Sequence, residues 1–241
     1  MGRFVVKFGG SSVADPKKLY AAARKLALLR RQGHEVVGVL SAQGNTTDAL
    51  LAKAKEIDPD CRGRELDVLL STGEQCSVGL CAMALGRLGM NAISLCGWQA
   101  GLLTHGPHGS ARVRSLSCDR ILRELERGNI VLVAGFQGVN EAGDITTIGR
   151  GGSDTTAVAL AAFLSADVCR IYTDVDGVYD KDPRQHPDAV KFDHLSYDDM
   201  LTLARGGARV LHDRCVELAK QYGVCVEVRS SFTDGEGTMV Y

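Results

Sequence analysis

A lysine followed closely by two glycines near the start of the chain could bind a phosphate group. Lys7 ends an apolar run, and Gly9, Gly10 and Ser11 follow one residue later. Because glycines lack side chains, their backbone N–H groups can approach an anion closely, and the lysine adds a positive charge. The lysine precedes the glycines, which distinguishes the segment from the G-x-x-x-x-G-K-[ST] loop. A tight turn with a surface lysine is the alternative interpretation.

A second glycine-rich segment precedes an expected helix. Three glycines between residues 149 and 152 surround Arg150, Ser153 is the expected N-cap, and Asp154 lies in the first turn. A helix N-terminus offers free N–H groups and a positive dipole end, and an arginine can bind a carboxylate through two hydrogen bonds. These residue types predict a site for an acidic substrate. The alternative is an ordinary glycine loop with a serine cap and an aspartate that complements the helix dipole.

Residues 173–184 have the mixed composition of a nucleotide-binding loop. They follow an apolar run and contain carboxylates, a tyrosine and basic side chains, which suit a ribose, a base and phosphates. A calcium-binding EF-hand is excluded because Val178 stands where that motif requires a carboxylate or an amide.

Two further segments place small hydroxyl side chains beside expected apolar elements. Residues 41–47 follow a strand, and residues 71–75 interrupt an otherwise amphipathic helix. We predict that both are walls of a site, although such clusters cap helices more often than they bind substrates.

The elements that would position these segments alternate between short apolar strands and longer helices. Asp15 and Pro16 have the residue types of an N-cap and a first helical position. The expected strands are 3–8, 36–40, 92–95, 130–134, 168–172 and 224–228, and the expected helices are 16–32, 64–88, 117–127, 153–165, 196–204 and 209–222. This alternation predicts a three-layer α/β/α sandwich with a mostly parallel central sheet, whose ligands bind beyond the carboxyl ends of the strands. We expect residues 101–115 to be a flexible excursion.

Composition excludes several classes of protein. The 241 residues, 45% of them apolar, suit one α/β domain. The 28 Lys and Arg residues balance 29 Asp and Glu residues, so no global charge recruits nucleic acid or an anionic membrane. No apolar run approaches about 18 residues and no signal-peptide pattern opens the chain, so we expect a cytoplasmic protein. The eight cysteines lack C-x-x-C spacing and are expected to be reduced core residues.

Taken in order, these segments resemble the motifs of the aspartate kinases, a branch of the amino acid kinase superfamily. The matching segments are KFGGSSV (7–13), SAQGNTTD (41–48), STGEQ (71–75), GWQAG (97–101), GFQGVN (135–140), TTIGRGGSDTTAVALAA (146–162) and YTDVDGVYDKDPR (172–184). They span the whole chain. KFGG and DGVY indicate only the superfamily, whereas STGEQ and GRGGSDTTA together are specific for the aspartate branch.

The resemblance implies that ATP, with Mg²⁺, phosphorylates the side-chain carboxylate of L-aspartate, the first step toward lysine, threonine, methionine and isoleucine. It implies a substrate side in the N-terminal part and an ATP side from about residue 150. The implied catalytic residues are Lys7 at the transferring phosphoryl group, Asp154 orienting that lysine, and Arg209. The implied aspartate-binding residues are Ser41, Thr47, Glu74 at the ammonium, Arg150 at a carboxylate, and Ser153. The implied ATP-binding residues are Lys7, Gly9, Gly10, Ser11, Thr173, Asp174, Tyr179, Lys181, Asp182 and Arg184, and no side chain is assigned to a metal.

The sequence departs from the family pattern in two respects. Lysine is usual where Arg209 stands, and arginine keeps the charge without the compact geometry of an ammonium. The family usually continues into C-terminal ACT domains, whereas we expect residues 1–241 to form a single kinase domain without one. A homodimer and a separate ACT-containing regulatory subunit are the partners that the resemblance allows. The open alternatives are a kinase acting on glutamate, acetylglutamate, UMP or carbamate, and a non-catalytic regulatory subunit.

Overall fold

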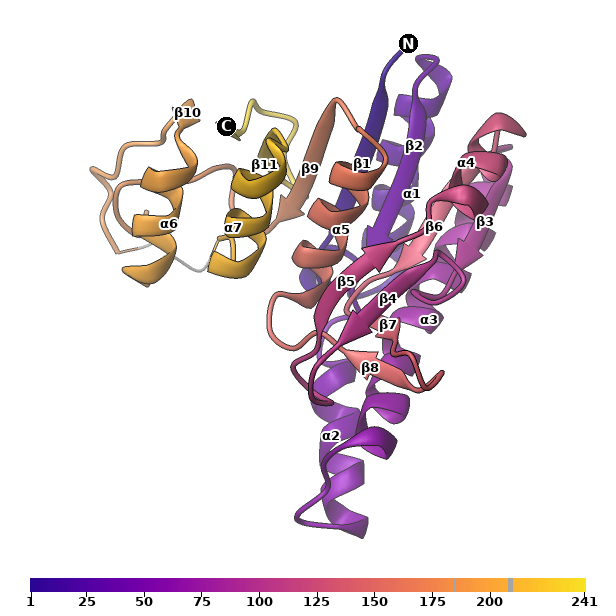
Figure 1. Ribbon diagram of the computed structural model, residues 1–241. Helices are drawn as coiled ribbons and strands as arrows, with labels where there is room; N and C mark the ends of the chain where they lie inside the picture. The colour runs from indigo at the N-terminus through magenta and orange to yellow at the C-terminus, as the bar shows by residue number, and fades with distance from the viewer. Residues whose placement is uncertain (184, 208–209) are drawn as a thin grey trace.

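A central sheet of eight strands carries the fold (Figure 1). The computed structural model describes residues 1–183, 185–207 and 210–241, so the predictions for Arg184 and Arg209 lie outside the described residues. The strand order is β10-β12-β11-β9-β1-β2-β6-β3, and only the β11–β12 pair is antiparallel. The strands are β1 (Arg3–Phe8), β2 (Glu35–Leu40), β3 (Ala92–Leu95), β6 (Ile130–Ala134), β9 (Val168–Thr173), β10 (His194–Leu195), β11 (Val226–Ser230) and β12 (Thr238–Val240).

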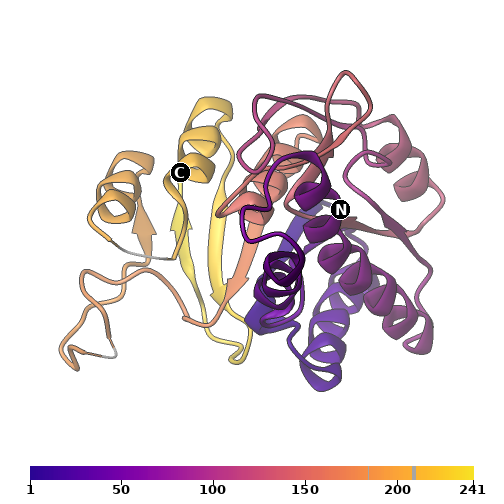
Figure 2. The same cartoon turned by 90° about the horizontal axis from the view of Figure 1, so that it is seen from below.

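Helices cover both faces of this sheet, and Figure 2 shows the two helix layers on opposite sides of the strands. One layer consists of α1 (Pro16–Arg31) and α3 (Arg64–Arg87), with α2 (Thr46–Ile57) packed on α3. The other consists of α4 (Asp119–Glu126), α5 (Gly152–Phe163) and α7 (Asp213–Tyr222), with α6 (Tyr197–Arg205) packed on α7. Successive strand residues alternate between the layers, since Val5 packs with the α5 side and Val6 with the α1 side. The predicted three-layer sandwich is therefore confirmed.

The start of α1 forms as its sequence predicts. Asp15 is the N-cap, its carboxylate accepts a 2.8 Å hydrogen bond from the backbone N–H of Lys18, and Pro16 occupies the first position. The expected helix at 153–165 instead begins at Gly152, with Gly151 rather than Ser153 as its N-cap. In the described part of the chain, the last helix begins at Asp213 rather than at residue 209.

A second sheet lies where the sequence predicts an excursion. It has the order β5-β4-β7-β8 and consists of β4 (Leu102–His105), β5 (Arg112–Leu116), β7 (Gln137–Val139) and β8 (Ile145–Thr147). The prediction of a flexible segment at 101–115 is wrong because β4 and β5 pair there, and Leu102 and Thr104 are fully buried.

The predicted helix at 64–88 is confirmed, because α3 runs unbroken through the small and polar residues 71–75. The hydroxyl of Ser71 donates to the carbonyl of Val68, and that of Ser77 donates to the carbonyl of Gly73. These bonds satisfy the polar side chains on the helix's own backbone.

Among the described helices, α3 alone is long and apolar enough to cross a membrane by length and composition, although the sequence analysis finds no such run. It packs against α1, α2 and strands of both sheets, and it buries Asp67 and Glu74. The core helix of a folded domain passes the same test, so this finding is weak evidence for a membrane span.

The prediction that the cysteines are core residues holds for Cys81, Cys169 and Cys215. Cys76 is exposed, and the other four are partly exposed. All eight lie in the described part of the chain and are free thiols there.

Replacing Asp15 with alanine should lower the free energy of unfolding by about 1 kcal/mol, because the backbone N–H of Lys18 loses its acceptor. Urea unfolding monitored by circular dichroism measures this difference. Lys17→Ala, at an exposed neighbouring position, is the control and should change it by less than about 0.5 kcal/mol. Equal stability of the two variants would contradict the capping role.

Candidate active site

The turns that follow β1 and β2 meet at the carboxyl edge of the main sheet. The backbone N–H of Ser41 donates to the carbonyl of Phe8, and that of Gly44 donates to the carbonyl of Gly10. A Cβ on Gly10 would lie 2.8 Å from the carbonyl oxygen of Ala42, so this close approach requires glycine. The predicted phosphate cradle therefore lies against the 41–44 turn.

Lys7, the penultimate residue of β1, points toward the first turn of α5. Its Nζ lies 2.5 Å from Oδ1 of Asp154, and the two side chains are 11% and 9% exposed. Two buried cysteines surround the pair, and burial raises the pKa of the Cys169 and Cys215 thiols, which stay neutral. The ammonium is little exposed to water, so its charge is weakly screened. The structure thus brings together the two side chains that the sequence pairs.

The N-terminus of α5 is buried beside this ion pair and no side chain among the described residues caps it. Gly151 has φ +69°, and a Cβ there would lie 2.3 Å from the ring of His212. Ser153 packs against the chain after β6, because a Cβ on Gly135 would lie 2.7 Å from its hydroxyl. Such an uncapped helix end favours an anionic group.

Phe136 lies between β6 and β7 and is held in the left-handed region, with φ +70°. Its N–H donates to the hydroxyl of Thr156 on α5, and its carbonyl accepts from Ile148. A non-glycine residue in this region stores strain that the surrounding contacts must maintain. This strained corner joins the end of β6 to the loop that carries Arg150.

Glu74 contacts the turn that follows β2. Its side chain comes from the middle of α3, and its Oε1 accepts a 3.1 Å hydrogen bond from the N–H of Ala42. Oε2 is buried without a hydrogen-bond partner among the described residues, and burial raises the pKa of Glu74 to about 7. Ser41 and Thr47 are half-buried in the segment that packs on α3 beside it. An unpaired buried carboxylate oxygen fits a cationic group of a ligand.

Arg150 differs from these residues because it is exposed. It lies in the loop between β8 and α5, and no ion pair joins it to any described residue. Its guanidinium is therefore available for a carboxylate or a phosphate.

The candidate ATP-side residues extend from the end of β9. Thr173 accepts a backbone hydrogen bond from Ser231 on its carbonyl and donates from its hydroxyl to Asp174. Farther along, Tyr179 donates to Asp176 and Lys181 pairs with Asp188 at 2.6 Å. Burial, and then the Asp176 contact, raise the pKa of Tyr179. Asp182 begins a turn in which its carbonyl accepts from the N–H groups of residues 185 and 186.

Two buried polar residues near this site were missed by the sequence analysis. Asp67 lies two turns before Glu74 on α3, and Gln137 lies on β7 with an unpaired side-chain oxygen. The GFQGVN segment was a signal for Gln137, whereas nothing distinguished Asp67 from a solvated residue of a helix first turn.

Comparison with known proteins gives consistent findings. The model of the amino acid kinase family matches residues 2–230. An aspartokinase of Geobacillus stearothermophilus is 54% identical over 240 residues, which cover 100% of this chain and 59% of that protein. The chain thus spans about three fifths of the length of this curated relative.

Solved structures agree in fold. The crystal structure of aspartate kinase from Synechocystis has a TM-score of 0.87 and 44% identity, covering 99% of this chain and 39% of that chain. That of E. coli aspartokinase III in complex with aspartate and ADP has a TM-score of 0.89 and 28% identity, covering 98% and 64%. The family match extends over both glycine-rich turns, Glu74 and the strands that position them. The chain belongs to the amino acid kinase family.

Proposed function

We propose that this chain transfers the γ-phosphoryl group of ATP to the side-chain carboxylate of L-aspartate. The observation that carries the proposal is Glu74, a buried carboxylate with one oxygen unpaired, in a site that also offers the free guanidinium of Arg150. Aspartate has the matching groups, an ammonium for Glu74 and a carboxylate for Arg150. The similar E. coli structure, described as a complex with aspartate and ADP, supports the same assignment.

The proposed chemistry needs charge neutralisation more than proton transfer. The substrate carboxylate is already ionised, so its oxygen attacks the γ-phosphorus directly while the bond to the bridging oxygen breaks and ADP leaves. Lys7, held by Asp154, stabilises negative charge on the transferring group. The glycine turn and the first turn of α5 supply backbone N–H groups to the phosphates. This role requires no serine, cysteine or histidine nucleophile.

Mg²⁺ would enter with the nucleotide. The described residues contain no group of three His, Cys, Asp or Glu side chains that could hold a metal. Mg²⁺ typically keeps several waters and binds one or two carboxylates together with substrate phosphates, so it would need few ligands from the protein. When bound, it would neutralise phosphate charge.

A substrate panel separates the proposal from its alternatives. ADP production should depend on L-aspartate, and hydroxylamine should trap the acyl phosphate as a hydroxamate. Preference for glutamate, acetylglutamate, carbamate or UMP would assign another reaction of the family. ATP binding without turnover on any of these substrates would support a non-catalytic subunit.

Replacing Lys7 with alanine should lower kcat on the order of 100- to 1,000-fold, or roughly 3 to 4 kcal/mol, with a much smaller change in KM for ATP. The single variant leaves Asp154 buried without its ion pair. The double variant Lys7→Ala/Asp154→Asn should therefore regain thermal stability without regaining activity. Steady-state kinetics and thermal unfolding measure both effects. A near-normal kcat in Lys7→Ala would remove Lys7 from the mechanism.

The raised pKa of Glu74 predicts opposite effects on stability and binding. In the folded state this carboxyl binds a proton up to about pH 7, whereas its ordinary pKa is 4.5. Stability therefore falls as pH rises from about 4.5 to about 7. Glu74→Gln should exceed the wild type in melting temperature most clearly above pH 7, and this advantage should shrink toward pH 4.5. The same variant should bind aspartate much more weakly.

Differential scanning fluorimetry across this pH range, together with KM for aspartate, tests the pair of effects. In the wild type, KM for aspartate should rise as pH falls below about 7, because protonated Glu74 cannot pair with the ammonium. Glu65→Gln, at an exposed position on the same helix, is the control and should show neither effect. Normal aspartate KM in Glu74→Gln would remove Glu74 from the substrate site.

A further inference from the structure

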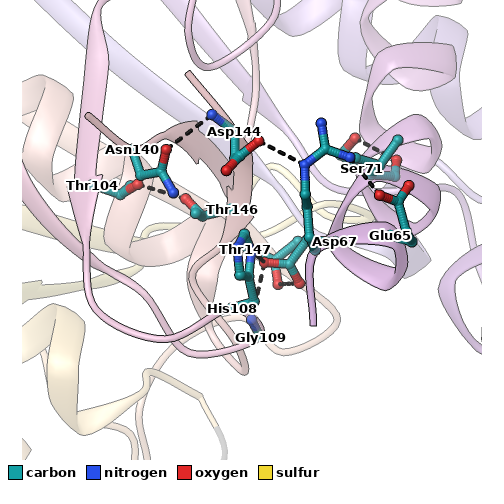
Figure 3. Close-up of polar contacts among 12 residues, drawn as sticks. Glu65, Asp67, Ser71, Thr104, His108, Gly109, Asn140, Asp144, Thr146 and Thr147 are labelled. Carbon is teal, nitrogen blue, oxygen red and sulfur yellow. Dashed lines mark hydrogen bonds and ion pairs between the residues drawn. The ribbon is translucent and has the colours of Figure 1, made fainter. Parts of the chain in front are cut away.

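Asp67 attaches α3 to two other segments of the chain (Figure 3). Its Oδ2 accepts hydrogen bonds from the backbone N–H groups of Thr147, at 2.8 Å, and Gly109, at 3.0 Å. Nδ1 of His108 lies 3.1 Å from the same oxygen, and Oδ1 accepts from the hydroxyl of Thr147 at 2.7 Å. The side chain is 2% exposed. One carboxylate of α3 therefore holds the end of β8 and the β4–β5 loop.

A hydrogen bond from Gln137 also attaches the small sheet to α3. Nε2 of Gln137 donates to the backbone carbonyl of Ser71 at 2.8 Å, and Gln137 is the cross-strand partner of Thr147. Both strands of the β7–β8 pair are thus attached to α3 at adjacent turns. Residues 67, 71 and 74 lie on one face of a helix, so these attachments and Glu74 share the face that borders the site.

The tethered strand leads directly to Arg150. Thr147 ends β8, and a Cβ on Gly149 would lie 3.0 Å from the carbonyl of Gly109, which Asp67 also holds through its N–H. The position of the Arg150 loop relative to α3 therefore depends on Asp67. The proposed substrate needs Glu74 and Arg150 at a fixed separation, because its ammonium and carboxylate belong to one small molecule.

We propose that Asp67 is a positioning residue that sets the separation between Glu74 and the Arg150 loop and thereby controls aspartate affinity. This inference rests on the proposed function. Asp67 lies outside the reacting groups, so its loss should act mainly on KM for aspartate, through the misplacement of Arg150. KM for ATP should change little, because Lys7 and the 9–11 turn are held by β1, β2 and β9.

The test compares three variants with the wild type. Asp67→Ala should raise KM for aspartate about 10- to 100-fold, the effect expected when a binding group moves by about 1 Å, with KM for ATP within about twofold. Asp67→Asn should keep KM for aspartate within about threefold. Its amide oxygen can still accept from the two N–H groups, and its NH₂ can donate to the Thr147 hydroxyl.

The matched control is Glu124→Ala. Glu124 is another carboxylate with 3% exposure; it lies on α4, in the helix layer on the other face of the sheet from α3, and accepts from the side chains of Arg127 and Asn129. This variant should lose stability as Asp67→Ala does while both KM values stay within about twofold of the wild type. Thr147→Val, which removes only the hydroxyl bond to Asp67, replaces Asp67→Ala if that variant does not fold, and should raise KM for aspartate about 3- to 10-fold.

Two outcomes would overturn the proposal. One is a destabilised Asp67→Ala whose KM for aspartate equals that of Glu124→Ala, and the other is an equal rise in both KM values. If the wild type gives no aspartate-dependent ADP, the proposed function fails, and amide hydrogen exchange then decides the positioning role. Faster exchange at residues 147–152 in Asp67→Ala, but not in Glu124→Ala, supports it, and unchanged exchange there rejects it.

Discussion

The buried ion pair between Lys7 and Asp154 is the interaction on which the rest of the site depends. It joins the end of the central strand β1 to the first turn of α5, in surroundings that include two neutral thiols. Replacing a buried ion pair by apolar residues is often neutral or stabilising, so stability alone does not explain these charges. We propose that they serve a ligand that needs a positive charge at this edge, next to the glycine turn and the uncapped N-terminus of α5.

Glu74 is a second buried acidic side chain, and its environment differs from that of the Lys7–Asp154 ion pair. Its burial is unfavourable for the ionised form, as the pKa of about 7 shows, and one of its oxygens is unpaired among the described residues. An ammonium group bound there would replace the lost hydration and restore full ionisation. The site therefore holds one pair of charges that neutralise each other and one carboxylate with an unpaired oxygen. Binding of the proposed substrate would supply the missing positive charge.

Much of the fold could be predicted because its strands are buried on both faces and therefore appear as continuous apolar runs, such as Val5-Val6 and residues 130–134. The smaller sheet could not be, because several of its buried residues are polar. Thr104 and Thr146 are fully buried and bond each other through their hydroxyls, although in sequence they resemble loop residues. The glycine turns, Lys7 and Asp154 could be predicted from motif and spacing. Asp67 could not, since an acidic residue in a helix first turn ordinarily complements the dipole in water.

The proposed site combines an exposed side chain, that of Arg150, with a backbone that is held in place. This combination suits the binding of a small polar substrate. Arg150 is exposed, and holding a long side chain in one geometry costs conformational entropy on binding. The backbone that carries it is held by several contacts. Strand β8 pairs with β7, and Thr147 donates to Asp67. The carbonyl of the strained Phe136 accepts a hydrogen bond from the N–H of Ile148. Only the side chain, and not the loop, then has to be ordered when a carboxylate arrives. The small sheet thereby gives Arg150 a base whose position relative to α3, the helix that carries Glu74, is fixed by hydrogen bonds.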